Sequence, residues 1–177
     1  NGGSVIAVDL EDSTPIFALE ATDDTDATIV IDEEENHPFI YTGTEVDHQG
    51  PFGDCLLRKI DGITGEVIWS LSYPAYSIPD VNGGMLDTPI VGKEKIDHLV
   101  IFTIARYDTI NGGLMVAVNK ETGEEEWRLL MTNYAWSSPV DVYTENGDVY
   151  ILQADSAGNM HLISARSGEV LDVMNLG

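Results

Sequence analysis

Apolar residues in this chain occur in short runs separated by turn-forming residues. Near the C-terminus the runs are Pro139–Val142, Val149–Gln153, Met160–Ser164 and Glu169–Val173. Alternating or continuous apolar patterning over so few positions is typical of β-strands. No window of useful length shows the 3.6-residue period of a helix. The pattern therefore predicts an all-β chain of short antiparallel strands.

Two longer segments repeat the same order of four strands. The predicted strands are Thr28–Ile31, Phe39–Thr42, Leu56–Ile60 and Glu66–Leu71, and then Pro89–Val91, Leu99–Ile104, Leu114–Val118 and Glu124–Leu129. Four antiparallel strands in each repeating unit are typical of the blades of a β-propeller.

The repeat is also visible in the residues themselves. Asn1–Asp9 reads almost onto Asn111–Asn119, and related copies surround Gly65 and Gly168. Anchored on one turn position, the copies follow each other at roughly 50 residues, a spacing typical of repeat architectures. We predict one partial propeller of about three and a half four-stranded blades over 1–177, with a half blade at 1–20 and blades at 21–80, 81–135 and 136–177.

The best-preserved copies are Asp61–Trp69 and Asn119–Trp127. The Thr-Gly pair closes a tight turn between the third and fourth strands, where glycine adopts a positive φ without cost. The tryptophan on the outer strand offers a large flat surface that packs one blade onto the next. We predict structural docking roles for Gly65, Trp69, Gly123, Trp127 and Gly168. The motif is weaker in the outer copies, where Ser13, Phe17 and Asp172 replace its residues.

This motif resembles the tryptophan-docking repeat of pyrroloquinoline-quinone (PQQ) type β-propellers. That family shows an apolar residue, Asp, two free positions, Thr-Gly, and Trp four residues after the Gly. The resemblance covers nearly the whole chain. It extends to quinone-dependent dehydrogenases and also to assembly lipoproteins and cell-surface proteins that use this blade without a quinone.

The resemblance implies that the loops joining strand two to three, and strand four to the next strand one, share a binding face. Here these loops are 45–54, 72–84, 106–112 and 132–136, which are long and rich in aromatic residues. Aromatic residues with sparse polar partners suit a sugar, peptide or protein ligand, although they could instead pack the loops against the blades. The candidate ligand-binding residues are Asp47, His48, Phe52, Tyr73, Tyr76, Asp80, Arg106, Tyr107, Asp108, Tyr134 and Trp136.

The charge of the chain is strongly negative. It has 31 acidic and 8 basic residues, a formal net charge of −23. Such a field repels nucleic acid and anionic membranes, and no apolar run approaches the ~20 residues that span a bilayer. An acidic surface poor in lysine favours an extracellular, cell-surface or periplasmic location. The single cysteine, Cys55, allows no internal disulfide.

One acidic segment could bind calcium. Asp23, Asp24 and Asp26 offer the oxygen ligands that hard cations prefer. The segment lacks the glycine turn and distal glutamate of a full calcium loop, so a solvated charged turn is the alternative.

Two functions fit this sequence. The first is a non-catalytic binding or scaffold propeller. The alternative is part of a PQQ-dependent dehydrogenase, for which the resemblance implies calcium ligands, a catalytic Asp, and an Arg or Lys near the quinone. Arg106 and Asp108 could supply a cation and a base, but Cys55 has no neighbouring cysteine for the disulfide that many such enzymes carry. We favour the binding propeller, expect no PQQ, and expect the remainder of the propeller or another chain to close the ring.

Overall fold

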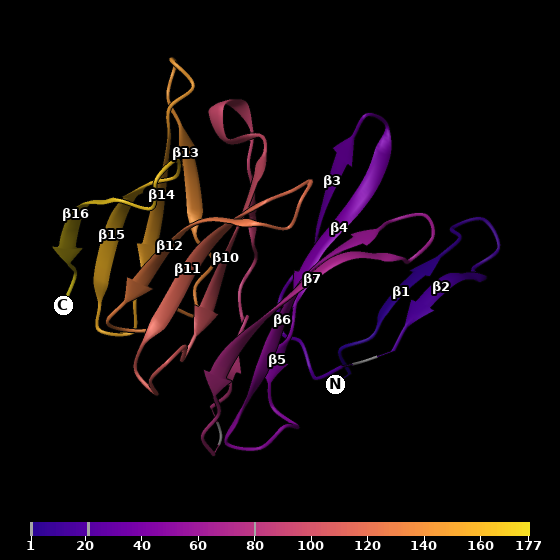
Figure 1. The fold of residues 1–177 in the computed structure, drawn as a ribbon, viewed down its shortest axis with the longest axis horizontal. Helices are drawn as coiled ribbons and strands as arrows, with labels where there is room; N and C mark the ends of the chain where they lie inside the picture. The colour runs from indigo at the N-terminus through magenta and orange to yellow at the C-terminus, as the bar shows by residue number, and fades with distance from the viewer. Residues whose placement is uncertain (1, 21, 80) are drawn as a thin grey trace.

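The computed structural model describes residues 2–20, 22–79 and 81–177 and consists almost entirely of β-strands (Figure 1). Four antiparallel sheets follow one another in chain order, from β1–β2 at one side to β13–β16 at the other. In the described residues the one helical element is a short 3₁₀ turn, η1 (Glu94–Ile96). The predicted all-β partial propeller is confirmed.

The first sheet has two strands and the others are built on four. The first contains β1 (Val5–Val8) and β2 (Pro15–Leu19). The second contains, in order, β3 (Val30–Glu34), β4 (His37–Gly43), β6 (Phe52–Asp61) and β7 (Val67–Tyr76). The third contains β9 (Ile90–Val91), β10 (Leu99–Ala105), β11 (Gly113–Asn119) and β12 (Glu125–Met131). The fourth contains β13 (Val140–Tyr143), β14 (Val149–Ala154), β15 (Asn159–Ser164) and β16 (Val170–Asn175). The division of the chain at residues 20, 80 and 135 stays a prediction.

The second sheet is longer than the sequence pattern predicts. β6 begins at Phe52 and β7 continues to Tyr76, and these two residues face each other at the end of the ladder. The predicted loops 45–54 and 72–84 are therefore partly strand, because backbone hydrogen bonds continue past the apolar positions that define the pattern. Two further short strands, β5 (Glu45–Val46) and β8 (Gly83–Gly84), also lie within those segments and extend the third sheet.

The turn between the last two strands of each sheet has the same geometry in all four copies. Ser13, Gly65, Gly123 and Gly168 have φ values of 60°, 77°, 73° and 70°. Each N–H donates a 2.9 Å hydrogen bond to the carbonyl oxygen four residues earlier. A β-bulge interrupts the ladder just before each turn, for example between Lys59 and Ile60. The shared geometry supports the alignment of Ser13 with the three glycines.

The aromatic residue of each outer strand covers the turn glycine of the next sheet. Trp69 lies over Gly123, Trp127 over Gly168, and Phe17 over Gly65. Both indole N–H groups also donate to carbonyl oxygens across the boundary, Trp69 to Lys120 at 3.0 Å and Trp127 to Ala165 at 3.1 Å. These contacts join separate sheets into one arc.

The core lies between sheets rather than within them. One cluster includes Tyr41 and Leu57 of the second sheet with Phe102 and Val116 of the third. Another joins the third sheet to the fourth, around residues that include Ile101 and Ile151. Propeller blades bury their flat faces against one another in this way.

Candidate functional site

One end of the arc carries the connections that the sequence analysis assigns to ligand binding. These are the described parts of 22–29, 44–51, 77–89, 106–112, 132–139 and 155–158, which we call the loop end. In Figure 1 the loop end is at the bottom, and the β3–β4 and β13–β14 hairpins are at the top. The opposite end, which also carries the Thr-Gly turns, is called the turn end.

Backbone pairing between neighbouring sheets positions the loop end. Gly84 pairs with Glu45 on one side and with Ala105 of β10 on the other. A Cβ at Gly84 would meet Glu45 Cα at 2.7 Å, so a residue with a side chain does not fit there. The N–H of Glu45 in turn donates to the Asp24 carbonyl oxygen at 3.1 Å. Three loops from distant parts of the chain are thereby fixed around Glu45.

Asp23 organises the loop that follows β5. Its carboxylate accepts hydrogen bonds from the backbone N–H groups of His48 and Asp47, at 2.9 and 3.2 Å, and from Gln49 Nε2 at 2.7 Å. Burial by itself would raise the pKa of Asp23, but these hydrogen bonds outweigh it and lower the pKa. Asp23 is thus an ionised loop-ordering residue whose acceptor capacity is largely used by the protein.

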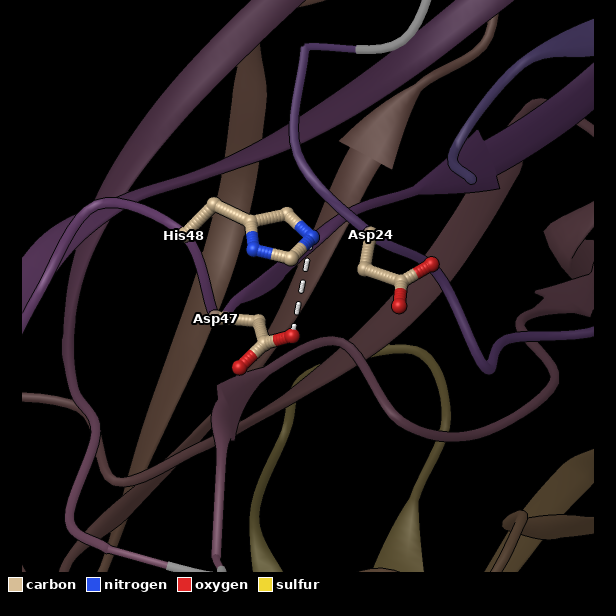
Figure 2. Close-up of side chains that lie close together, drawn as sticks. All are labelled: Asp24, Asp47 and His48. Carbon is tan, nitrogen blue, oxygen red and sulfur yellow. Dashed lines mark ion pairs between the residues drawn. The ribbon is translucent and has the colours of Figure 1, made fainter. Parts of the chain in front are cut away.

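A different set of side chains has the spacing of cation ligands. Asp24, Asp47 and His48 each bring one ligand atom within 4.8 Å of the others, from the segment before β3 and the loop after β5 (Figure 2). His48 Nε2 lies 3.7 Å from Asp47 Oδ2. Of the predicted group Asp23, Asp24 and Asp26, the structure brings Asp24 alone into this arrangement. Calcium binding stays a prediction.

Arg106 is a buried structural cation. Its Nη1 donates to the Ile110 carbonyl oxygen at 2.7 Å, and its guanidinium carbon lies 4.4 Å from the centre of the Tyr134 ring. Its own carbonyl oxygen accepts a 3.1 Å bond from the Tyr76 N–H. The side chain therefore links the 106–112 loop to the 132–139 segment, and its 3% exposure leaves little of it in reach of a ligand.

Trp136 stands between two hollows on the loop end. It is 49% exposed, and its ring lies tilted against Tyr134 at a centroid distance of 5.2 Å. On one side is a pocket of about 270 Å³, lined by Asp26, Glu45, Val81, Asn82, Leu86 and Trp136. On the other side a second hollow is lined by Tyr134, Trp136, Ser137, Ala154, Asp155 and Ser156. Exposed aromatic residues beside polar pockets are typical of recognition surfaces.

The first pocket, which we call the Trp136 pocket, contains a buried carboxyl group. Glu45 is 2% exposed and accepts a 3.0 Å hydrogen bond from Asn82 Nδ2. Burial raises its pKa, and the nearby carboxylates of Asp26, Asp24 and Asp47 raise it further. The pocket therefore concentrates negative charge beside an exposed indole.

Two predicted ligand-binding residues lie away from this pocket. Tyr73 donates from its hydroxyl to Glu125 Oε2 at 3.0 Å, across the boundary between β7 and β12. Tyr107 packs edge-on against Tyr73 at 6.3 Å, and Arg128 Nη1 donates to its hydroxyl. These contacts match the alternative that loop aromatics pack blades together.

The remaining candidates are distributed over the loop end. Phe52 and Tyr76 form an edge-on pair at 4.9 Å at the end of the β6–β7 ladder, with Phe52 exposed. Asp108 is exposed in the loop after β10 and has a positive φ of 61°. Asp80 lies outside the described residues.

Sequence reasoning missed Glu45, Val81, Asn82 and Leu86 as pocket-lining residues. The β5–β8 pairing that places Glu45 depends on two short strands with no apolar pattern of their own. The Gly83-Gly84 pair was the available signal, because consecutive glycines often mark a close approach of two backbones.

Comparison with known proteins shows the fold. No family model matches the chain, and no curated protein matches its sequence. Among solved structures, quinohemoprotein alcohol dehydrogenase from Comamonas testosteroni is similar with a TM-score of 0.68 and 12% identity, over 99% of this chain and 33% of the enzyme. The Dos1 propeller has a TM-score of 0.62 and 8% identity, over 98% of this chain and 43% of that one. BamB from Moraxella catarrhalis has a TM-score of 0.54 and 13% identity, over 99% of this chain and 59% of that one.

These likenesses show that the chain has the fold of a partial β-propeller, as its repeat predicts. The chain spans about a third of the length of the quinohemoprotein dehydrogenases. At such low identities the likeness concerns the fold. In the described parts of the chain, no helix has the length and apolar character needed to cross a membrane.

Proposed function

We propose that this chain is a non-catalytic binding section of an exported propeller, and that its loop end contacts a protein or peptide partner. The observation that carries the proposal is the contrast among the three tryptophans. Trp69 and Trp127 are half-buried and hydrogen-bonded between sheets, whereas Trp136 is exposed between two hollows and its N–H has no partner among the described residues. An exposed indole beside pockets is suited to contact a partner.

The alternative, a quinone site, fits the loop end poorly. PQQ is an anionic quinone, and the resemblance implies an accessible Arg or Lys beside it in addition to calcium. Arg106 is the sole lysine or arginine in the described loop-end segments, and it is buried under Tyr134 and bonded to the Ile110 carbonyl. The Trp136 pocket presents carboxyl groups without a lysine or arginine beside them, and without calcium these would repel the quinone.

The composition supports an external location for the same protein. With 31 acidic and 8 basic residues, the chain has a surface that suits secreted or periplasmic proteins. The charge also disfavours nucleic acid as the partner.

Site-specific photo-crosslinking in the source cell tests the proposal. A photoreactive phenylalanine analogue would replace Trp136 or Phe52 at the loop end, and Ile63 at the turn end as the matched exposed position. We expect one discrete crosslinked partner from the loop-end positions and none from Ile63. Equal crosslinking at both ends, or a partner seen at Ile63 alone, would contradict the proposal.

A second experiment separates the quinone alternative. PQQ with Ca²⁺ would be titrated into the chain while tryptophan fluorescence and quinone absorbance are followed. We expect no saturable change. Stoichiometric quinone binding that disappears in an Arg106→Gln variant would favour the dehydrogenase instead.

A further inference from the structure

We infer that the Trp136 pocket binds an arginine side chain from a basic segment of a partner protein. This inference rests on the proposed function and names the chemistry of the partner. It follows from the separation of charge between the two ends of the arc, the composition of the pocket, and the exposed indole at its rim.

The basic residues are almost absent from the loop end. Apart from the buried Arg106, they lie in turn-end segments or within strands: Lys93, Lys95, Lys120, Arg166, Arg58, Lys59 and Arg128. Several are already paired, such as Lys59 with Glu34 at 2.9 Å and Lys120 with Asp32 at 2.6 Å. The acidic groups of the loop end therefore have few internal counter-charges among the described residues.

Those acidic groups converge on one place. Asp26 and Glu45 line the Trp136 pocket, and Asp24 and Asp47 lie near enough to act on Glu45. Clustering carboxylates without a cation is unfavourable, because like charges repel and burial disfavours ionisation. A positive group in the pocket would relieve both costs. Asn82, which donates to Glu45 Oε2, holds that carboxyl in place.

The indole favours a guanidinium over a plain ammonium. Trp136 is 49% exposed and borders the pocket. A guanidinium is planar, stacks on an indole face and donates to a carboxylate through two parallel N–H groups. The pocket combines both partners, because the exposed carboxylate of Asp26 is within reach of a ligand while the buried Glu45 adds charge behind it. Its volume of about 270 Å³ accommodates one side-chain head rather than a folded element.

The protein surface around the pocket supports a segment rather than a free small cation. Tyr134 packs against Trp136, and a second hollow continues on the other side of the indole. An extended chain can place one side chain in the first hollow and lie across Trp136 into the second. A peptide that contacts the surface through several successive residues makes more contacts than an isolated amine.

The test uses the full chain and a fluorescein-labelled peptide of repeated Arg-Ser-Gly units, followed by anisotropy at low ionic strength. The matched peptide carries citrulline, which keeps the shape of arginine and removes its charge. We expect the arginine peptide to bind at least about tenfold more tightly, and added salt to weaken it. Equal binding of the two peptides would overturn the inference.

A pair of double variants locates the site. Asp26→Asn with Glu45→Gln removes two charges from the pocket, and Glu33→Gln with Glu35→Gln removes two exposed charges from the turn end. We expect the first pair to weaken binding about tenfold and the second to change it less than twofold. Thermal unfolding and circular dichroism check that both variants are folded. Equal losses from the two pairs would show diffuse attraction to an acidic protein and would overturn the inference.

The two proposals fail in different ways. If discrete crosslinks persist at Trp136 but citrulline and arginine peptides bind alike, the loop end is a binding surface for a partner without a basic segment, and the inference is wrong. If crosslinks are absent from the loop end, the proposed function itself is wrong.

Discussion

The indole nitrogen of Trp69 donates a hydrogen bond to the carbonyl oxygen of Lys120, 3.0 Å away in the next sheet. The same indole covers Gly123, three residues further along the turn. Trp127 repeats this relationship with Ala165 and Gly168 one sheet later. The turn glycine therefore serves two purposes: it adopts the left-handed conformation, and it leaves room for the aromatic ring of the preceding sheet.

Gly123→Ala should destabilise the protein by more than its backbone strain alone. A Cβ at this position would lie 2.8 Å from Trp69 Cγ, in addition to adopting a φ of 73°. Gly147→Ala is the matched control, because its φ is 77° but its nearest neighbours would be 3.7 Å away. We expect a loss of roughly 1 kcal/mol for Gly147→Ala and about 2–4 kcal/mol for Gly123→Ala in urea unfolding. Equal losses would mean that the ring does not press on the glycine.

Two substitutions of Trp127 should separate the stabilisation by its hydrogen bond from the stabilisation by its packing. Trp127→Phe keeps a ring over Gly168 and removes the bond to Ala165, so we expect a loss of about 1 kcal/mol in the free energy of unfolding. Trp127→Ala removes both and should cost about 3 kcal/mol. Neither change should alter ligand binding at the loop end in protein that remains folded. Lost binding with an unchanged melting temperature would instead place Trp127 in the ligand site.

The repeat made the fold predictable because the repeated residues are the ones that make contacts between successive sheets. The turn glycines, the aromatic residue after them and the apolar strand centres all meet equivalent partners in successive copies. Even Ser13, which departs from the motif, has the turn conformation expected from its alignment, with a φ of 60°. The ends of β6 and β7 were not predictable. Residues such as Gly53 and Pro74 add little to the apolar pattern, although Gly53 pairs with Ala75 and Pro74 with Asp54 in the ladder.

The Thr64-Gly65 turn should make the stability of the fold depend on pH, through the carboxylate of Asp61. The N–H groups of Thr64 and then Ile63 donate to the Asp61 carboxylate, and with His37 they lower its pKa to about 2. A carboxyl whose pKa is lower in the folded state stabilises the fold above its unfolded-state pKa. That contribution is lost as the pH falls through the folded-state pKa. The affected window runs from the ordinary value of 3.8 down to about 2.

Asp61→Asn tests this dependence with little change to the turn. Asn119 already fills the equivalent position and accepts hydrogen bonds from the Glu121 and Thr122 N–H groups at 3.0 and 3.1 Å. We expect the wild type to lose more stability than the variant between pH 4 and pH 2, as measured by chemical denaturation. Glu66→Gln, which removes one exposed carboxylate from the same turn, controls for net charge. Parallel acid profiles for wild type and Asp61→Asn would contradict the prediction.

Cys55 should be inert in the folded protein. It is completely buried, and burial raises the pKa of its thiol to about 12. Since the thiolate is the reactive form, iodoacetamide at neutral pH should modify the native chain very slowly and the denatured chain quickly. Mass spectrometry of both samples measures the ratio. Rapid labelling of the native chain would show that the β6 region opens readily.

The candidate site was predicted less completely than the fold. Aromatic composition pointed to the loop end and included Trp136, Tyr134 and Phe52. It could not distinguish these from Tyr73, whose hydroxyl partner Glu125 lies on the next blade. Nor could it distinguish them from Tyr107, whose ring packs against Tyr73 across the same boundary. Local sequence does not indicate which loop residues meet across a blade boundary, since that depends on how successive sheets are placed.

This chain is an open section of a propeller whose two lateral faces are uncovered. Phe17 and Leu19 pack on the second sheet, so the alternate positions Ile6 and Ile16 face outward and are 60% and 55% exposed. At the other side Ile151 and Ile163 pack inward, which leaves Leu152 and Leu162 half-buried and Met174 62% exposed. Apolar faces of this kind normally find a partner.

Multi-angle light scattering on the isolated 177-residue chain over a range of concentrations tests this claim most directly. The predicted result is a mass that rises above the 19.3 kDa of one chain as the concentration increases. Charged substitutions at Ile6 and Met174 should return the mass toward that of the monomer while the circular dichroism spectrum stays that of a folded β protein. A stable monomer at high concentration, with native circular dichroism and a cooperative thermal transition, would contradict the open arc.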